Sequence, residues 1–127
     1  MTFPFNPTQG PVYIEAELSG PTGRVSLRLL LDLGATTTLI NANTLVSVGY
    51  DPGASPDQVQ VMTGNGVIFV PRLVVNRLTL LGHHRIGFSV LAHTLPPNAG
   101  VHGLLGLDFF RGHILTLDFR GGMISLS

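Results

Sequence analysis

One carboxylate stands out in the sequence: Asp32, within the stretch LLLDLGATTTLI of residues 29–40. It follows three leucines and precedes Leu33 and Gly34, so it ends an apolar segment just before a sharp turn. Ionised carboxylates are rarely buried without a partner. The position therefore predicts either an aspartate that binds its own backbone at a strand end, or a carboxylate that works together with a second group.

Other patterns that could carry chemistry are weaker. The chain has no cysteine, which excludes disulfides, thiol catalysis and a thiolate metal site. His83 and His84 are adjacent, so in a strand their side chains point to opposite faces and make a poor metal site. The sequence contains no Gly-x-Ser-x-Gly elbow, no Ser-His-Asp order and no phosphate-binding glycine loop. We therefore expect no metal and no cofactor.

The elements that would position Asp32 are short. Sixteen glycines and nine prolines punctuate the chain, which favours an all-β fold. Residues 12–18 and 24–32 alternate apolar and polar side chains, which predicts a hairpin that brings Asp32 to a strand end. A second hairpin is predicted over residues 58–71, with Asn65 and Gly66 at its tip.

The rest of the pattern extends the same fold. We expect two strands over residues 72–92 with a break near Gly82, a strand leading into a short helix over 101–113, and a closing hairpin over 114–127. Asn41 or Asn43 could cap a short helix over residues 42–48 that ends at Gly49. This gives about eight or nine strands and one or two short helices.

Composition is typical of one compact domain. Hydrophobic residues make up 44% and charged residues 11% of the 127 residues, so we expect a single domain over 1–127, with part of its surface covered by a partner. The formal net charge is zero, so the sequence indicates no positive electrostatic field that would attract nucleic acid. No apolar run approaches the roughly 20 residues of a membrane span. The first residues lack a secretory signal pattern, so the default expectation for localisation is cytoplasmic.

Three features follow one another along the chain: Asp-Leu-Gly-Ala at 32–35, a TGNG hairpin tip at 63–66 and the apolar GLLGLDFF at 103–110. This ordered set resembles the retropepsin-like aspartic protease family, over nearly the whole chain. The usual core of that family is Asp-Thr-Gly-Ala or Asp-Ser-Gly-Ala after apolar residues, then a glycine-rich flap, then Leu-Leu-Gly-x-Asp-x-Leu. The resemblance implies a closed acid-protease barrel with one lobe per chain and one or two short helices.

The resemblance also implies a homodimeric aspartic endopeptidase with a peptide or protein substrate. Two-lobed relatives carry both aspartates in one long chain, whereas this chain has a single Asp-x-Gly. The second carboxylate would then be Asp32 of a second copy, across a two-fold axis. Two carboxylates that share one proton supply both the base that activates a water and the acid that polarises the substrate carbonyl.

The family pattern assigns roles to the matching residues. Asp32 is the expected catalytic residue, and Leu33, Gly34 and Ala35 form the active-site loop. Thr63, Gly64, Asn65 and Gly66 are the expected flap, for which a plain hairpin is the alternative. Leu104, Leu105, Gly106 and Asp108 are expected to support the loop from behind, with Asp108 structural rather than catalytic.

Leu33 departs from the family pattern. The family's Thr or Ser at this position makes hydrogen bonds across the dimer axis, and leucine has no hydroxyl. A backbone hydrogen-bond donor that is left unpaired on the second chain costs about 1–3 kcal/mol per side. Apolar contact between the two Leu33 side chains could offset part of this cost. The alternative function is a catalytically impaired dimer that serves as a peptide-binding or assembly module. A third possibility is an unrelated all-β binding barrel.

Overall fold

The fold starts from the hairpin that the sequence alternation predicts. In the computed structural model, which describes residues 1–127, β2 (Tyr13–Gly20) pairs antiparallel with β3 (Gly23–Leu31). The even-numbered apolar residues of β2, such as Ile14 and Leu18, are buried, whereas Glu15 is exposed. This two-residue period places one face of the hairpin in the core. The predicted hairpin is confirmed, and it ends beside Asp32.

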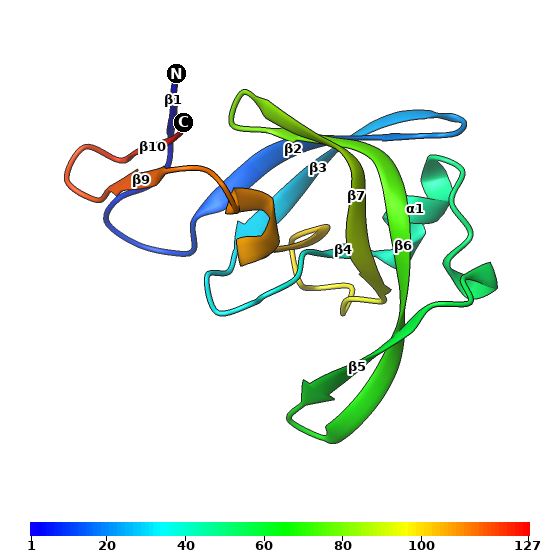
Figure 1. The fold of residues 1–127 in the computed structure, drawn as a ribbon. Coiled ribbons are helices and arrows are strands. Elements are labelled where there is room, and N and C mark those ends of the chain that lie inside the picture. The colour runs from blue at the N-terminus through cyan, green and yellow to red at the C-terminus, as the bar shows by residue number, and fades with distance from the viewer.

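Ten strands, one short α-helix and two 3-10 turns make up the chain (Figure 1). In order they are β1 (Thr2–Pro4), β2, β3, β4 (Leu39–Asn41), α1 (Ala42–Ser47), η1 (Pro52–Ala54), β5 (Gln58–Thr63), β6 (Gly66–Leu80), β7 (His83–His93), β8 (Gly103–Leu105), η2 (Leu107–Phe110), β9 (Leu115–Asp118) and β10 (Met123–Leu126). No helix has the length and apolar character that crossing a membrane requires.

Six strands close into a barrel. Their order is β2-β3-β8-β4-β7-β6, and the pairing of β6 with β2, from Ala16↔Leu80 to Ser19↔Arg77, joins the two ends. The β3–β8 and β4–β7 pairs are parallel, and the remaining pairs are antiparallel. The expected closed all-β barrel is confirmed. Its core is apolar and includes the fully buried Phe109.

β6 differs from the sequence prediction, because one strand of 15 residues replaces two separate strands that would divide after Pro71. The Arg72 N–H donates to the Asp57 carbonyl, on the β5 side of the strand. Because successive backbone nitrogens of a strand point to opposite sides, the Pro71 nitrogen faces the β7 side. Pairing with β7 has ended there, at Arg72↔Leu91, and the missing N–H of proline removes no bond from that ladder. The strand therefore runs through the proline and out of the barrel to pair with β5.

Two short strands were not predicted. β1 and β4 have three residues each, which is too short for a readable alternation. β1 pairs with β10, and β10 with β9, in a separate three-stranded sheet that places the chain ends side by side (Figure 1). The predicted helix near residues 42–48 is confirmed, with the Asn41 side chain accepting from the Asn43 N–H at 3.3 Å and Gly49 following its end.

Candidate active site

Asp32 follows directly after β3, in a loop that is held in place by hydrogen bonds of the Asp32 backbone. Its N–H donates to the Leu105 carbonyl at 3.0 Å, and its carbonyl accepts from the Ala35 N–H at 3.1 Å. Its Oδ1 accepts from the Gly34 N–H at 3.0 Å. Its Oδ2 has no hydrogen-bond partner within the chain, and the residue is only half-buried. One oxygen is thus fixed by the loop while the other is free to meet a bound molecule.

The segment from β8 into η2 packs directly behind this loop. The Leu107 N–H donates to the Ala35 carbonyl at 2.9 Å. A Cβ on Gly106 would lie 2.8 Å from the Thr37 carbonyl carbon and 2.9 Å from the Ala35 oxygen, so only glycine permits this approach. The GLLGLDFF stretch therefore comes into backbone contact with the Asp32 loop, although the two lie far apart in the sequence.

Thr38 is the centre of this contact, and it was not among the residues predicted from the sequence. It is fully buried, and its hydroxyl donates to Asp108 Oδ1 at 2.7 Å while its N–H donates to Asp108 Oδ2 at 3.0 Å. The same hydroxyl accepts from the Gly106 N–H at 3.1 Å. The available signal was a threonine next to the apolar Leu39 and Ile40, at the start of a strand. Asp108 has both oxygens engaged, so it is not free to act as a second catalytic carboxylate.

A cleft of about 450 Å³ opens in front of the loop. Its lining comes from three places: the loop (Asp32, Gly34, Ala35, Thr36, Thr37), the barrel wall (Leu39, Leu91, Leu104) and β5 (Val59, Gln60, Val61, Met62). Asp32 is the only carboxylate among these residues. The cleft therefore combines one acid with apolar side chains from the barrel wall and β5, which suits an extended peptide with apolar side chains.

The predicted site residues fall into two groups. The structure brings Asp32, Gly34, Ala35 and Leu104 together around the cleft, with Leu105, Gly106 and Asp108 behind them. Leu33 does not line the cleft, and 45% of its surface is exposed. The tip residues 63–66 are also outside the lining, since the hairpin meets the cleft through residues 59–62.

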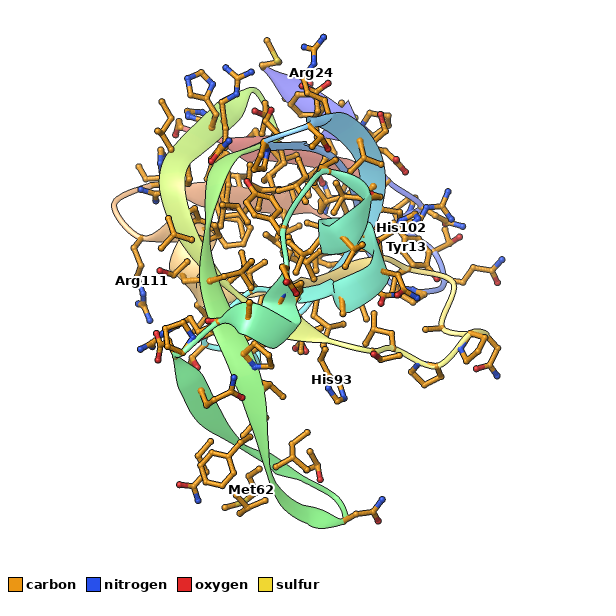
Figure 2. The ribbon with its side chains drawn as sticks, turned by 90° about the vertical axis from the view of Figure 1, so that its right-hand side faces the viewer. Tyr13, Arg24, Met62, His93, His102 and Arg111 are labelled. Atoms are coloured by element: carbon orange, nitrogen blue, oxygen red, sulfur yellow. The ribbon has the colours of Figure 1, made fainter.

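The hairpin around Asn65 has the predicted tip geometry. Thr63 pairs with Gly66, whose φ of +116° favours glycine, and the Thr63 hydroxyl donates to the Gly66 carbonyl at 2.9 Å. The hairpin extends away from the barrel and carries Met62, which is 83% exposed (Figure 2). Its role as a moving flap stays a prediction.

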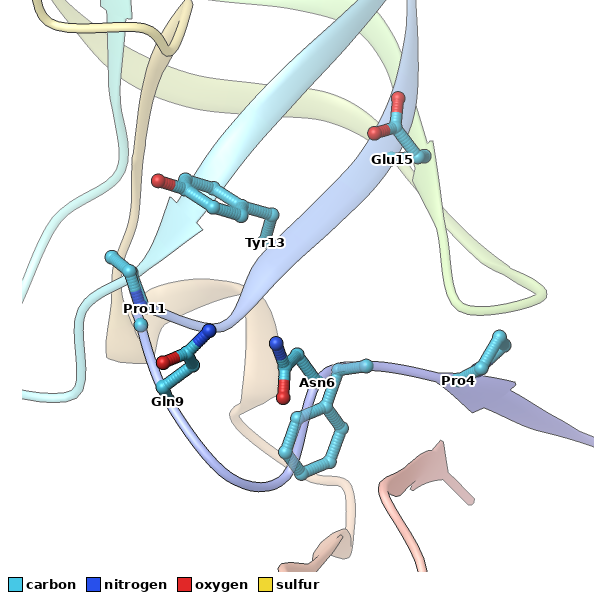
Figure 3. Close-up of a pocket in the computed structure, with 8 residues that line it drawn as sticks. Pro4, Asn6, Gln9, Pro11, Tyr13 and Glu15 are labelled. Atoms are coloured by element: carbon cyan, nitrogen blue, oxygen red, sulfur yellow. The ribbon is translucent and has the colours of Figure 1, made fainter.

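A separate hollow of about 630 Å³ lies between the N-terminal loop and β2 (Figure 3). Its lining shares no residue with the cleft and includes Asn6, Gln9, Tyr13 and Glu15. Glu15 is its only carboxylate, and it pairs with Arg28 at 3.3 Å. Because its one acid is paired with Arg28 and largely exposed, this hollow is a weaker candidate for acid–base chemistry than the Asp32 cleft.

Comparisons with known proteins agree with this geometry. A crystal structure of a retropepsin-like aspartic protease from Rickettsia conorii is similar over 99% of this chain and 88% of that chain, with a TM-score of 0.74 and 17% sequence identity. No curated protein sequence matches the chain. The sequence profile of a family described as "Aspartyl protease" matches residues 14–109, which contain Asp32, the hairpin and the supporting segment. The chain thus belongs to the aspartyl protease family, and its fold is retropepsin-like.

Proposed function

We propose that the protein is a homodimeric aspartic endopeptidase, in which Asp32 from two copies forms one active site. The observation that carries this proposal is that one chain offers a single free carboxylate to the cleft. Asp32 is the only carboxylate lining the cleft, and Asp108 behind it has both oxygens bound to Thr38. Peptide hydrolysis by paired carboxylates needs two, so the second comes from another copy of the chain.

In this dimer the two carboxylates hold a water between them and share one proton. The ionised carboxylate takes a proton from the water, whose oxygen attacks the peptide carbonyl carbon. The protonated carboxylate donates a hydrogen bond to the carbonyl oxygen as negative charge develops there. The first carboxylate then passes the proton that it took from the water to the amide nitrogen, the C–N bond breaks, and the amine leaves while the carbonyl re-forms as part of a carboxylic acid. Such acid–base help is worth about 10²–10⁴-fold in rate, and accurate positioning supplies much of the rest.

The cleft walls favour substrates with apolar side chains beside the cleaved bond. Leu39, Leu91 and Leu104 line the barrel side, and Val59 and Val61 face them from the hairpin. Burial of apolar side chains between these walls would supply binding free energy of about 25 cal/mol per Å². A hairpin that closes over the bound peptide would also exclude water from the reacting atoms.

A second candidate function is a dimer that binds peptides but cleaves them poorly. Leu33 favours it, because its side chain is 45% exposed and offers no hydroxyl to brace the neighbouring loop. An active site with a loosely held dyad would lose rate before it lost affinity for the peptide.

A cleavage assay separates the two functions. The purified chain is incubated with a diverse peptide library from about pH 3 to 7, where a carboxylate pair passes through its singly protonated state. An endopeptidase should give a bell-shaped rate profile on the acidic side and lose activity in Asp32→Asn. Asp51→Asn is the matched control, because Asp51 is exposed and its side chain caps nothing. Peptide binding without cleavage would support the second function.

A further inference from the structure

Arg85 on β7 binds the carbonyl end of η2. Its Nε and Nη2 donate to the Phe109 carbonyl at 3.0 and 2.7 Å, and Nη2 also donates to the Arg111 carbonyl. Its guanidinium carbon lies 5.7 Å from the centre of the Phe109 ring. The side chain makes no ion pair with a carboxylate, so these carbonyls are its principal partners. A cation at this end satisfies carbonyls that a helical turn leaves without partners.

The other end of η2 holds the loop that carries Asp32. Leu107, the first residue of η2, donates its N–H to the Ala35 carbonyl at 2.9 Å. Asp108 accepts both hydrogen bonds from Thr38, which lies at the far end of the same loop. The turn has only four residues, so a shift at its carbonyl end is transmitted to these contacts over a very short distance.

We propose that Arg85 is a positioning residue for the Asp32 carboxylate, which it orients through η2 and Thr38. The forked guanidinium fixes two carbonyls at once, and a single-point donor could not reproduce that geometry. The kinetic part of this proposal rests on the proposed endopeptidase function. Its structural part, which concerns how firmly the Thr38 and Leu107 hydrogen bonds are held, does not rest on that function.

Three variants test the assignment. Arg85→Met keeps an apolar stem beside the Phe109 ring and removes all three donated bonds. Arg85→Lys keeps the charge without the fork. Arg111→Gln is the matched control: it removes a cation from the same end of η2, and the Arg111 side chain is exposed and donates no hydrogen bond (Figure 2). Each is measured for kcat, KM and site-resolved amide hydrogen exchange, at a temperature where circular dichroism shows it to be folded.

We expect Arg85→Met to lower kcat about 10- to 100-fold while KM stays nearly constant, because misplaced carboxylates lose rate before affinity. Amide exchange at Thr38, Gly106 and Leu107 should rise about tenfold while the β2–β3 ladder stays protected. Arg85→Lys should lie between Arg85→Met and the parent protein, and Arg111→Gln should match the parent.

Unchanged exchange at Thr38 and Gly106 in Arg85→Met would overturn the proposal, as would an equal kinetic loss in Arg111→Gln. If Arg85→Met does not fold, Arg85→Lys decides, and exchange equal to that of the parent protein would refute the role of the fork. If the parent protein cleaves no peptide, the proposed function fails on its own. Amide exchange then decides the positioning role separately.

Discussion

Thr38 donates two hydrogen bonds to Asp108, one from its hydroxyl at 2.7 Å and one from its backbone N–H at 3.0 Å. The pair joins the end of the Asp32 loop to a turn 70 residues further along the chain. Because the Thr38 hydroxyl also accepts from Gly106, the three residues form a closed network behind the loop. The loop that carries the cleft carboxylate is therefore anchored at its Thr38 end by polar groups that do not line the cleft.

Thr38→Val tests this network, because valine keeps the shape of threonine and removes only the hydroxyl. It leaves the Gly106 N–H and one oxygen of Asp108 without their partner in a site that is partly or fully buried. We expect the free energy of unfolding to fall by about 1–3 kcal/mol, measured by urea denaturation. Thr36→Val is the control, since Thr36 is exposed and makes no side-chain hydrogen bond. Equal stability of both variants would show that the network contributes little.

Leu33 provides a second test, with valine as the matched control for threonine. Leu33→Thr introduces hydroxyls that could bridge the two loops of the proposed dimer, each bond being worth about 0.5–1.5 kcal/mol. We expect the dimer dissociation constant to fall about tenfold in sedimentation experiments, or the cleavage rate to rise. Leu33→Val has nearly the same shape without the hydroxyl and should give neither gain. If both variants behave alike, a hydroxyl at this position has no bracing effect.

The hairpin tip offers a pair of glycines that differ in one property. Neither Gly64 nor Gly66 would bring an added Cβ into contact, but only Gly66 has a positive φ, of +116°. Gly66→Ala should therefore cost about 1–3 kcal/mol in strain within the hairpin, whereas Gly64→Ala should be nearly neutral. Amide exchange of Val61 and Ile68 measures the effect directly, and a raised KM for peptides would link it to a flap. Equal exchange in the two variants would contradict this account of the tip.

The sequence predicted the parts of the fold that have strong periodic or turn signals. The first strand of the β2–β3 hairpin alternates in sequence over residues 12–18, and Asn65-Gly66 is a strong hairpin signal. β1 and β4 are too short to show a period, and their positions depend on partners far along the chain. The proline in β6 misled the prediction, because its effect depends on which side of the strand is paired.

The candidate site was predictable in outline for a similar reason. The Asp-Leu-Gly-Ala and GLLGLDFF motifs pointed to two segments, and the fold brings them into backbone contact. Thr38 and Arg85 were missed because neither carries a motif. A buried threonine and an arginine that binds two carbonyls become apparent only when their hydrogen-bond partners are known.

The most direct test of a shared active site is a mixing experiment. The protein and its Asp32→Asn variant are refolded together in varied proportions, so that chains pair at random, and peptide cleavage is measured at constant total protein. If each site needs Asp32 from both copies, activity should follow the square of the unmutated fraction, leaving about one quarter at equal mixing. Activity that falls in direct proportion to that fraction, leaving about half at equal mixing, would show that each chain carries a complete site and would contradict the dimeric dyad.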